Sequence, residues 1–404
     1  MMIKIAFRNI FRQKRRTILT VLTMLGGFTL SAVSIGWSDG SYNNIIDLFT
    51  RNQLGHIQIH TQGYLDKPTL YKTIHDYDKI ENQVLSVPCV QSCAPRVFSA
   101  GLASVGDKSA GVKIIGVDPR LENTATRLDK KVIEGKSLSM TPQHEILLGK
   151  GLAQVLYAKI GDEVVILSQG ADGSIANDLY IATGFIESSD KMSDQISLYL
   201  HVSDAQELLV LDGQVHEIAV IGTDLGDIPE LALEIRAAIN RQDLAVETWK
   251  EFANTFYQAM QADQQGMWVM LFVIILVVAV GVLNTVLMTV LERTREYGLL
   301  RAVGTSPSQV FRLVLAEVFF MSIIGVIIGS GLSYIANDIL STHGISLGQS
   351  FTFGGVEFTT MYGENNARCF YIPALCIVIS ATLISIFPAL KAAHIAPVKA
   401  MRTH

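Results

Sequence analysis

Four long runs of apolar residues constrain this chain more than any other feature. Residues 17–37, 267–291 and 371–390 contain no charged side chain, and the run 313–336 is broken only by Glu317. A helix needs about 20 apolar residues to cross the hydrocarbon core of a bilayer. Only 17% of the 404 residues are charged, against about 25% in soluble domains. The sequence therefore excludes a purely soluble enzyme and predicts four transmembrane helices.

The first run follows a basic segment, so a cleaved signal peptide is an alternative to a retained helix. It lacks a small-x-small cleavage site directly after a short apolar core. Thr, Gly and Ser recur through it, as expected for a helix that packs against others. We therefore interpret it as a retained helix.

The distribution of lysine and arginine predicts the orientation of the chain. Residues 1–16, 292–312 and 391–404 together hold thirteen basic residues and two acidic ones, although the whole chain has a net charge of -5. This asymmetry places both termini and the loop 292–312 in the cytoplasm. The segments expected are an amphipathic helix at 1–16, spans at 17–39, 267–291, 313–338 and 371–390, an external domain at 40–266, a short external loop at 339–370, and a cytoplasmic tail at 391–404.

The segment before the first span has the pattern of a helix lying in the membrane surface. Four apolar residues share one helical face and basic residues lie on the other; the apolar ones are Ile3, Phe7, Ile10 and Phe11. A basic topology signal without a further role explains the same residues.

The segment 40–266 is predicted to be a mixed α/β domain. Short alternating runs predict strands at 56–60, 112–117, 163–167, 179–186, 196–202 and 217–222. Helices are expected at 148–158, 203–211 and 227–241, with Ser203 as an N-cap. Residues 243–265 are expected to form a polar helix that continues into the second span.

This domain shows little sign of chemistry. His56 and His60 fall on one face of a strand, where a metal pair is an alternative to a solvated polar face. Gly149-Lys150-Gly151 is no phosphate loop, because GxxxxGK[ST] is absent, and GxSxG and HExxH are absent too. Cys89 and Cys93 lie outside the membrane in the predicted topology, where they form either a disulfide or a pair of free thiols.

Small residues mark the faces on which the spans pack. Gly325 and Gly329 lie four residues apart, and Gly27 occupies a similar stripe in the first span. Such residues let helix backbones approach closely, and we favour packing within the chain over a dimer seam. Glu317 is either paired with a partner or reaches the interface from the end of its helix.

The segment 283–332 carries a long motif. Its key residues are Asn284, Glu292, Arg293, Arg295, Glu296, Gly298, Leu299, Leu300, Arg301, Gly304, Glu317, Gly325 and Gly329, followed in the tail by Pro388, Ala389, Ala392, Ala393, Pro397 and Arg402. These residues resemble the signature of the FtsX-like/MacB-like permeases of ABC transporters. The external stretch 132–167 resembles the periplasmic core domain of that family.

The resemblance implies an α-helical membrane protein with four transmembrane helices. A large mixed α/β extracytoplasmic domain, the MacB-like periplasmic core, would lie between the first two. It also implies a second permease chain, identical or homologous, and two copies of a separate ATPase. Because no Walker A motif is present, ATP and Mg would bind only the ATPase, and this non-catalytic chain would hold no cofactor. The location implied is the bacterial inner membrane, with membrane lipids and no nucleic acid as partners.

The loop 292–312 is then expected to be the helix that couples to the ATPase. Its candidate residues are Glu292, Arg293, Arg295, Glu296, Gly298, Leu299, Leu300, Arg301 and Gly304. If acyl chains are the cargo, the first two spans border an apolar chamber, for which the candidates are Leu25, Phe28, Leu30, Val269, Phe272 and Leu276.

Within the family, the length and order of segments look most like the lipoprotein-releasing (LolC/LolE-type) permeases. That type moves lipoproteins out of the inner membrane to a periplasmic carrier by mechanotransmission. The hairpin that would match its carrier hook, SQGADGSIAND, is short and polar, without an apolar tip, which weighs against carrier docking on this chain. Two alternatives stay open: MacB-like export of peptides or toxins, and FtsX-like signalling to an external hydrolase.

Overall fold

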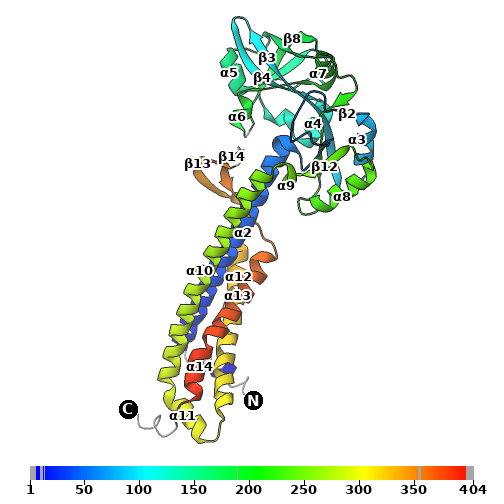
Figure 1. Cartoon of the computed structure of the whole chain (residues 1–404). Helices are drawn as coiled ribbons and strands as arrows, with labels where there is room; N and C mark the ends of the chain where they lie inside the picture. Colours follow the sequence, from blue (N-terminus) through cyan, green and yellow to red (C-terminus); the bar gives the residue numbers. More distant parts are fainter. Residues whose placement is uncertain (1–5, 10–11, 13, 189, 354–355, 397–404) are drawn as a thin grey trace. The chain divides into compact units, whose positions relative to one another are not determined.

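A computed structural model describes the chain except for residues 1–5, 10, 11, 13, 189, 354, 355 and 397–404. The chain divides into two compact units (Figure 1). The helical unit comprises Met1–Tyr42, Met260–Leu347 and Thr360–His404, and the sheet unit comprises Asn43–Ala259 and Gly348–Thr359. The expected amphipathic helix at 1–16 and the tail residues Pro397 and Arg402 fall wholly or partly outside the described residues.

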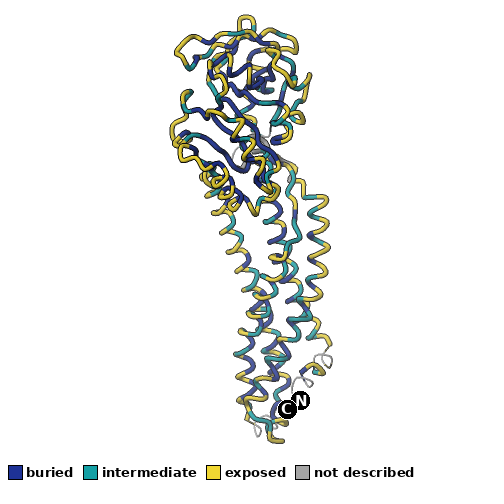
Figure 2. Tube along the Cα trace, turned by 90° about the vertical axis from the view of Figure 1, so that its right-hand side faces the viewer, coloured by how far each residue is buried: buried dark blue, intermediate teal, exposed yellow. Residues whose placement is uncertain are grey.

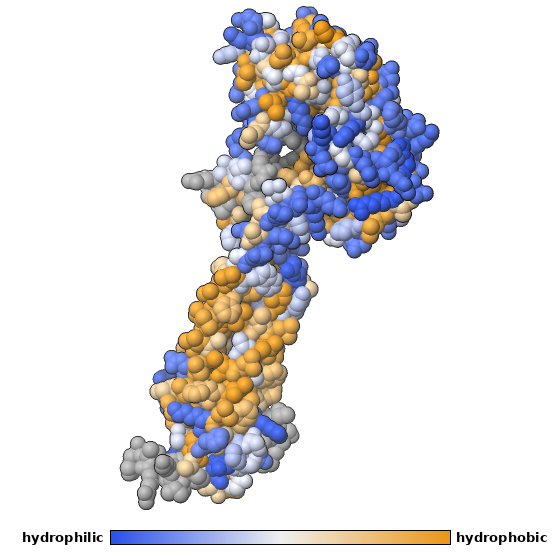
Figure 3. Space-filling view, viewed as in Figure 1, coloured by the Kyte–Doolittle hydropathy of each residue, from blue (hydrophilic) through white to orange (hydrophobic). Residues whose placement is uncertain are grey.

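The helical unit contains helices that are long and apolar enough to cross a membrane. The described residues give four such spans: α2 (Lys14–Phe49), α10 (Asn254–Glu292), α12 (Pro307–His343), and α13 (Arg368–Ile384) with α14 (Ile386–Ala393). Apolar residues dominate the middle of the visible face of this unit, and hydrophilic residues lie toward its ends (Figure 3). α2 and α10 are longer than the expected spans, and the division between the two units falls within both of them.

The core of the helical unit is built from one stripe of each helix. Met24 and Phe28 of α2 are fully buried, together with Val282 of α10, Val310 of α12 and Ile377 of α13. Buried residues recur along the helices in Figure 2, while other faces of the same helices stay exposed. In a membrane such helices are held by close packing rather than by exclusion of water.

The segment expected to be a short external loop has structure of its own. α12 continues to His343, and the chain then forms the strands β13 (Ile345–Phe353) and β14 (Val356–Met361). These two strands form a separate two-stranded sheet. The composition of this segment gave no clear strand signal, so the sequence analysis missed it.

The sheet unit is built on a ten-stranded sheet. Its strands are β1 (Ile57–Thr61), β3 (Val90–Val105), β4 (Lys108–Val117), β5 (Val132–Gly135), β6 (Glu145–Gly149), β7 (Glu163–Gln169), β8 (Ile175–Ile186), β9 (Ser197–His201), β11 (Glu217–Gly222) and β12 (Leu244–Thr248). The order is β12-β1-β11-β3-β4-β9-β6-β8-β5, and β7 pairs with both β3 and β8. The strands β3, β4, β9, β6, β8 and β7 therefore close into a ring.

Strand β3 joins the ring to the open part of the sheet. Its first half pairs with β11, from Arg96 opposite Glu217 back to Val90 opposite Gly222. Its second half pairs with β7, where Leu102 lies opposite Leu167. A strand of 16 residues can join both parts of this one sheet because its two ends use different partners.

Helices and short strands complete the sheet unit. They are η1 (Thr50–Leu54), β2 (Ile74–His75), α3 (Tyr77–Leu85), α4 (Pro119–Ala125), η2 (Leu128–Lys131), α5 (Lys150–Leu156), α6 (Lys191–Asp194), α7 (Val202–Leu209), β10 (Gln214–Val215), α8 (Ile228–Ile239) and α9 (Trp249–Phe252). Two predictions are wrong here. His201, and not Ser203, caps α7, because its ring nitrogen accepts a hydrogen bond from the Ser203 backbone. The expected polar helix at 243–265 begins instead as strand β12, which pairs with β1.

Candidate functional site

The loop between α10 and α12 folds into a short helix held at fixed angles. α11 (Thr294–Ala302) follows Arg293, which takes a non-helical conformation between the two helices. Gly304 has a φ of 102°, a left-handed conformation that ends helices at low cost only for glycine. Ser306 then caps α12 in a capping box with Gln309, and Pro307 takes the first helical position. The loop therefore contains a short helix with a defined start and stop.

Arg293 holds this end of the helical unit together. Its guanidinium donates to both carboxylate oxygens of Glu317 at 3.2 and 3.1 Å, and to Glu296 at 2.9 Å. It also lies over the ring of Tyr297, 5.2 Å from the centroid. Arg293 is 7% exposed, so the expectation that it contacts an ATPase is wrong. Its charge is used to join α10, α11 and α12.

Glu317 has internal partners, which decides between the two interpretations of this carboxylate. It is 7% exposed and accepts hydrogen bonds from Arg293 and from the Asn9 amide, the latter at 2.6 Å. A buried carboxylate is stable when its charge is paired and hydrogen-bonded in this way. Glu317 therefore ties the start of the chain to α12.

Two more ion pairs connect the basic residues before the first span to the loop. Arg16 pairs with Glu292, and Arg12 lies 3.6 Å from Glu296. The Arg12 and Glu296 side chains are 71% and 40% exposed, so this second pair contributes little. The basic residues of this segment thus do more than signal topology, because they contact the two acids of the loop.

The outer side of α11 presents apolar residues. Leu299, Leu300 and Val303 are exposed, Val303 to 81%. Arg295 is exposed beside them, whereas Gly298 is buried. The Arg301 side chain donates to the carbonyl oxygen of Thr305 at 3.4 Å. An apolar patch surrounded by charged groups is typical of a protein contact surface.

The predicted packing glycines lie where helices of this chain meet. A Cβ added to Gly27 would lie 2.1 Å from Val278, and one on Gly329 would lie 2.8 Å from the Phe28 ring. Gly325 faces the backbone and Cβ of α2 near Met24. These contacts show that the small residues serve packing within the chain.

The residues predicted to line a chamber do not all share one environment. Phe28 is fully buried against Gly329, so its assignment to a chamber wall is wrong. Leu25 is half-buried. Val269, Phe272 and Leu276 of α10 are 64%, 65% and 52% exposed, and Leu30 of α2 is also exposed. Val269, Phe272 and Leu276 therefore form an exposed apolar face on α10.

A polar contact between α2 and α12 was missed by the sequence analysis. Asn337 is fully buried in α12, and its amide lies 3.5 Å from the carbonyl oxygen of Ala32. It packs on Gly36, where an added Cβ would lie 2.4 Å from the amide nitrogen. An asparagine inside an apolar run and a facing glycine were the available signals.

The histidine pair of the sheet unit is structural. His56 accepts a hydrogen bond from the backbone of Gly222, and burial lowers the pKa of His56 to about 4. His60 is 1% exposed, and burial lowers its pKa as well. The described residues contain no cluster of three or more His, Cys, Asp or Glu able to hold a metal ion. The alternative of a solvated polar face is also wrong, because both rings are buried.

The two cysteines of the sheet unit are free thiols, so the disulfide is not formed. Cys93 lies in β3 opposite Val220 and is fully buried. Cys89 precedes the strand with a φ of 68° and is exposed. The turn at Cys89 directs the two side chains into different environments.

The hairpin between β7 and β8 is the counterpart of the predicted hook position. Its strands are Glu163–Gln169 and Ile175–Ile186, and Gln169 lies opposite Ile175. The turn between them is polar, but Ile175 beside it is 82% exposed. The sequence analysis expected a hairpin without an apolar tip, and the exposed Ile175 beside the turn corrects that expectation.

Two family models match long segments of the chain. Residues 17–238 match the family described as MacB-like periplasmic core domain, and residues 268–397 match FtsX-like permease C-terminal. The chain is 22% identical to the lipoprotein-releasing system transmembrane protein LolC of Neisseria meningitidis, over 98% of both chains. It is 21% identical to the macrolide export ATP-binding/permease protein MacB of Pasteurella multocida, over 98% of this chain and 59% of that protein. The crystal structure of the periplasmic region of MacB from Actinobacillus actinomycetemcomitans superimposes with a TM-score of 0.39 at 14% identity, covering 53% of this chain and 98% of that one.

Proposed function

Because the chain belongs to the FtsX-like and MacB-like family of ABC transporter permeases, we propose that it is the permease of a lipoprotein-releasing transporter. In this role it moves lipoproteins out of the outer leaflet of the inner membrane by mechanotransmission. The observation that carries the proposal is the similarity to LolC over 98% of both chains. The chain itself hydrolyses nothing, since ATP and Mg bind a separate ATPase.

The assembly that we propose contains two ATPase subunits and a second permease chain, identical or homologous. It lies in the bacterial inner membrane with both termini in the cytoplasm and the sheet unit in the periplasm. The exposed patch Leu299, Leu300 and Val303 on α11 supports an ATPase contact. The buried Arg293–Glu317 pair supports transmission, because it joins α11 to α12 rigidly.

A second candidate function is MacB-like export of peptides or toxins. It is favoured by the β7–β8 hairpin, whose turn Gly170–Ser174 is short and polar and leaves only Ile175 as an apolar contact beside it. A hairpin of this kind offers a lipoprotein carrier little apolar area. The cargo is therefore the part of the proposal that an experiment must decide first.

Leu300→Asp tests the coupling role of α11. A charge placed in the centre of an apolar contact loses its water and finds no partner there, which weakens the contact. We therefore expect ATPase stimulation and lipoprotein release to fall together by at least about tenfold. The variant and its ATPase are reconstituted in proteoliposomes, and ATP hydrolysis and lipoprotein release are measured in parallel. Ser308→Asp is the matched control, because it adds the same charge at an exposed site in the first turn of α12, where an acid is tolerated.

The outcomes separate coupling from cargo. Full hydrolysis and full release by Leu300→Asp would contradict the coupling role. For the cargo, photocrosslinkers at Val269 and Phe272 should capture an acylated lipoprotein before ATP is added. Capture of unacylated peptide alone would replace lipoprotein release with the export function, while leaving the coupling result intact.

A further inference from the structure

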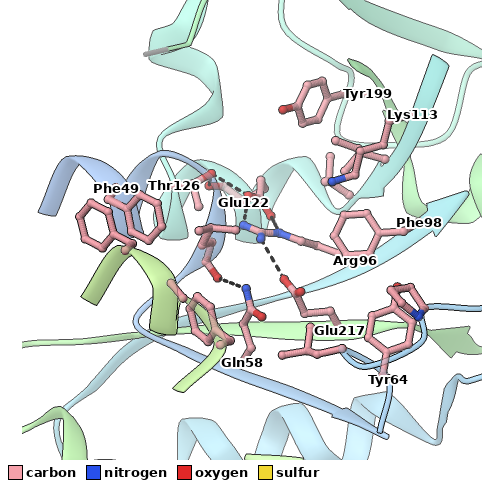
Figure 4. Close-up of a pocket in the computed structure, with 18 of the residues that line it drawn as sticks. Phe49, Gln58, Tyr64, Arg96, Phe98, Lys113, Glu122, Thr126, Tyr199 and Glu217 are labelled. Carbon is pink, nitrogen blue, oxygen red and sulfur yellow. Dashed lines mark hydrogen bonds and ion pairs between the residues drawn. The ribbon is translucent and has the colours of Figure 1, made fainter. Parts of the chain in front are cut away.

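The sheet unit contains a cavity of about 780 Å³ that the transport role does not use. Ligand sites in proteins commonly enclose about 300–1,000 Å³. Figure 4 shows side chains from several separate elements pointing into this space. They come from β1, β3, β4, β9 and β11, from α4, and from the ends of α2 and α10.

Most of the wall is apolar and aromatic. Phe49 and Phe256 stack in parallel with their ring centroids 4.0 Å apart, and both line the cavity. The other apolar lining residues include Leu54, Leu65, Phe98, Ile115, Val117, Leu128 and Phe252. An apolar wall of this extent favours an acyl or similar apolar chain, because each CH₂ group that leaves water adds to the free energy of binding.

The polar part of the wall is organised by Arg96. Its guanidinium donates to Glu122 at 2.7 and 3.2 Å and to Glu217 at 3.0 Å. All three side chains are 7% exposed or less. The two carboxylates neutralise Arg96, and one negative charge is left over from this group.

Two lysines more than balance that charge. Lys113 and Lys131 both line the cavity, which leaves it with one net positive charge. The Lys113 ammonium lies over the Phe98 ring, 4.9 Å from its centroid, and no described carboxylate lies within ion-pair distance of it. Burial lowers the pKa of both lysines, that of Lys131 to about 8. Lys113 is exposed to solvent, so an anionic headgroup that enters the cavity can reach its ammonium and pair with it.

We propose that this cavity binds a single-chain amphiphile with one anionic headgroup. Its apolar chain lies among Phe49, Leu65 and Phe256, and its headgroup pairs with Lys113. The proposal concerns the sheet unit alone and does not depend on which cargo the helical unit moves. A neutral amphiphile would fill the same apolar wall but would leave Lys113 without its counter-ion.

Photolabelling of the full chain in phosphatidylcholine nanodiscs tests the proposal. The probe is palmitate carrying a diazirine, and the competitors are unlabelled palmitate and palmityl alcohol, which have the same chain and differ in headgroup charge. We expect saturable labelling of peptides that contain Tyr64–Leu65 or 252–256. Palmitate should compete at least about tenfold better than the alcohol, as expected for one charge-assisted contact.

Two variants locate the chain and the headgroup. Leu65→Trp fills the rim of the cavity and should abolish labelling, whereas Val165→Trp on β7 should not, although both residues are 38% exposed. Lys113→Met keeps the length of the side chain and should remove the preference for palmitate over the alcohol. Lys108→Met, in the same strand outside the cavity, is its control.

Each outcome bears on the proposal. Labelling that is confined to 14–41 and 267–291 would show that the probe binds only as a bilayer lipid, and would overturn it. Equal competition by palmityl alcohol would overturn the anionic headgroup, and so would a Lys113→Met variant that still prefers palmitate. If Leu65→Trp unfolds at the same temperature as the unchanged chain and is still labelled saturably, the binding site lies outside this cavity. Loss of lipoprotein release, in contrast, would leave this result unaffected.

Discussion

Among the described residues, each unit contains one buried arginine that pairs with two carboxylates, but the two arrangements differ in what surrounds them. In the sheet unit, Arg96 and both of its partners are almost fully buried. In the helical unit, Arg293 pairs with buried Glu317 and with Glu296, whose side chain is 40% exposed. One cluster is closed to solvent and the other is open on one side.

The difference indicates different roles. A fully buried ionic cluster gains little net stability over an apolar one, but removing a single member leaves an unpaired buried charge. The Arg96 cluster therefore fixes how β3, β11 and α4 fit together. The Arg293 cluster can exchange its solvent-facing partner, because water can replace Glu296. An open cluster beside an exposed apolar patch suits an interface that changes during a transport cycle.

The largest expected effect comes from Arg96→Met compared with Arg293→Met. Arg96→Met leaves Glu122 and Glu217 buried without their cation and should destabilise the sheet unit by about 3–5 kcal/mol. Arg293→Met should cost less, about 1–3 kcal/mol, because it leaves only one buried carboxylate, Glu317, without its cation. Asn9 still donates to Glu317, and Glu296 can be hydrated. Amide hydrogen exchange of the full chain in nanodiscs measures both effects, in β3 and β11 for the first variant and in α11 for the second.

The same experiment can break the comparison. Loss of protection in the sheet unit of the Arg293→Met variant would mean that the two clusters are not independent. If Arg96→Met retained full protection of β3 and β11, the closed cluster would not hold these strands in place.

The two clusters also show what the sequence could predict. Arg293, Glu296 and Glu317 fall within one continuous motif, and the uncharged run around Glu317 made pairing with a partner one of two interpretations of this carboxylate. Their pairing needed only the fold-back of α12 on α10. The four apolar spans and six of the ten strands of the large sheet were predictable for the same reason, because their signals are local.

Arg96 gave no such signal. It lies in a strand that the sequence analysis did not predict, and its partner Glu217 is 121 residues away. Only the register of β3 against β11 brings them opposite each other. β12 and the burial of His56 and His60 were missed for the same reason, because sheet order is set by pairings distant in sequence. The exposure of Leu300 and the burial of Phe28 depend likewise on which helices pack together.

Substitution of two adjacent glycines of α2 should change stability less. The two glycines lie on different faces of this helix, so the pair compares these faces. Gly27→Ala should destabilise the helical unit by about 1–3 kcal/mol, as expected for overpacking, because its Cβ would lie 2.1 Å from Val278. Gly26→Ala should be neutral or slightly stabilising, since nothing lies within 4 Å of its added Cβ and alanine favours the helix. Thermal unfolding in detergent measures both variants.

This pair carries its own control, because the two substitutions are identical and adjacent. Equal destabilisation by both would indicate that Gly26 also faces a helix, as in a dimer of permease chains. Such a result would show that the exposed face of α2 is covered in the assembled transporter.

The smallest effect concerns how the closed cluster responds to pH. Burial raises the pKa of Glu122, but the positive charge of Arg96, together with hydrogen bonds from Arg96 and Thr126, outweighs burial and leaves that pKa below the ordinary value of 4.5. Burial raises the pKa of Glu217 above that value, since its single Arg96 contact does not offset burial. The folded chain therefore protonates Glu217 at a higher pH than the unfolded chain does, and it protonates Glu122 at a lower pH.

The signs follow from linkage between protonation and folding. Above pH 4.5 the folded chain binds the extra proton at Glu217, so acidification toward pH 4.5 should raise the stability of the sheet unit. Below pH 4.5 the unfolded chain binds the extra proton in place of Glu122, so stability should then fall. Burial also raises the pKa of Asp194 and Asp204, so Glu217→Gln should reduce the rise without abolishing it and should keep the fall. Hydrogen exchange of β3 across this range measures both. If the rise were undiminished in Glu217→Gln, the groups that take up the proton would lie outside the Arg96 cluster.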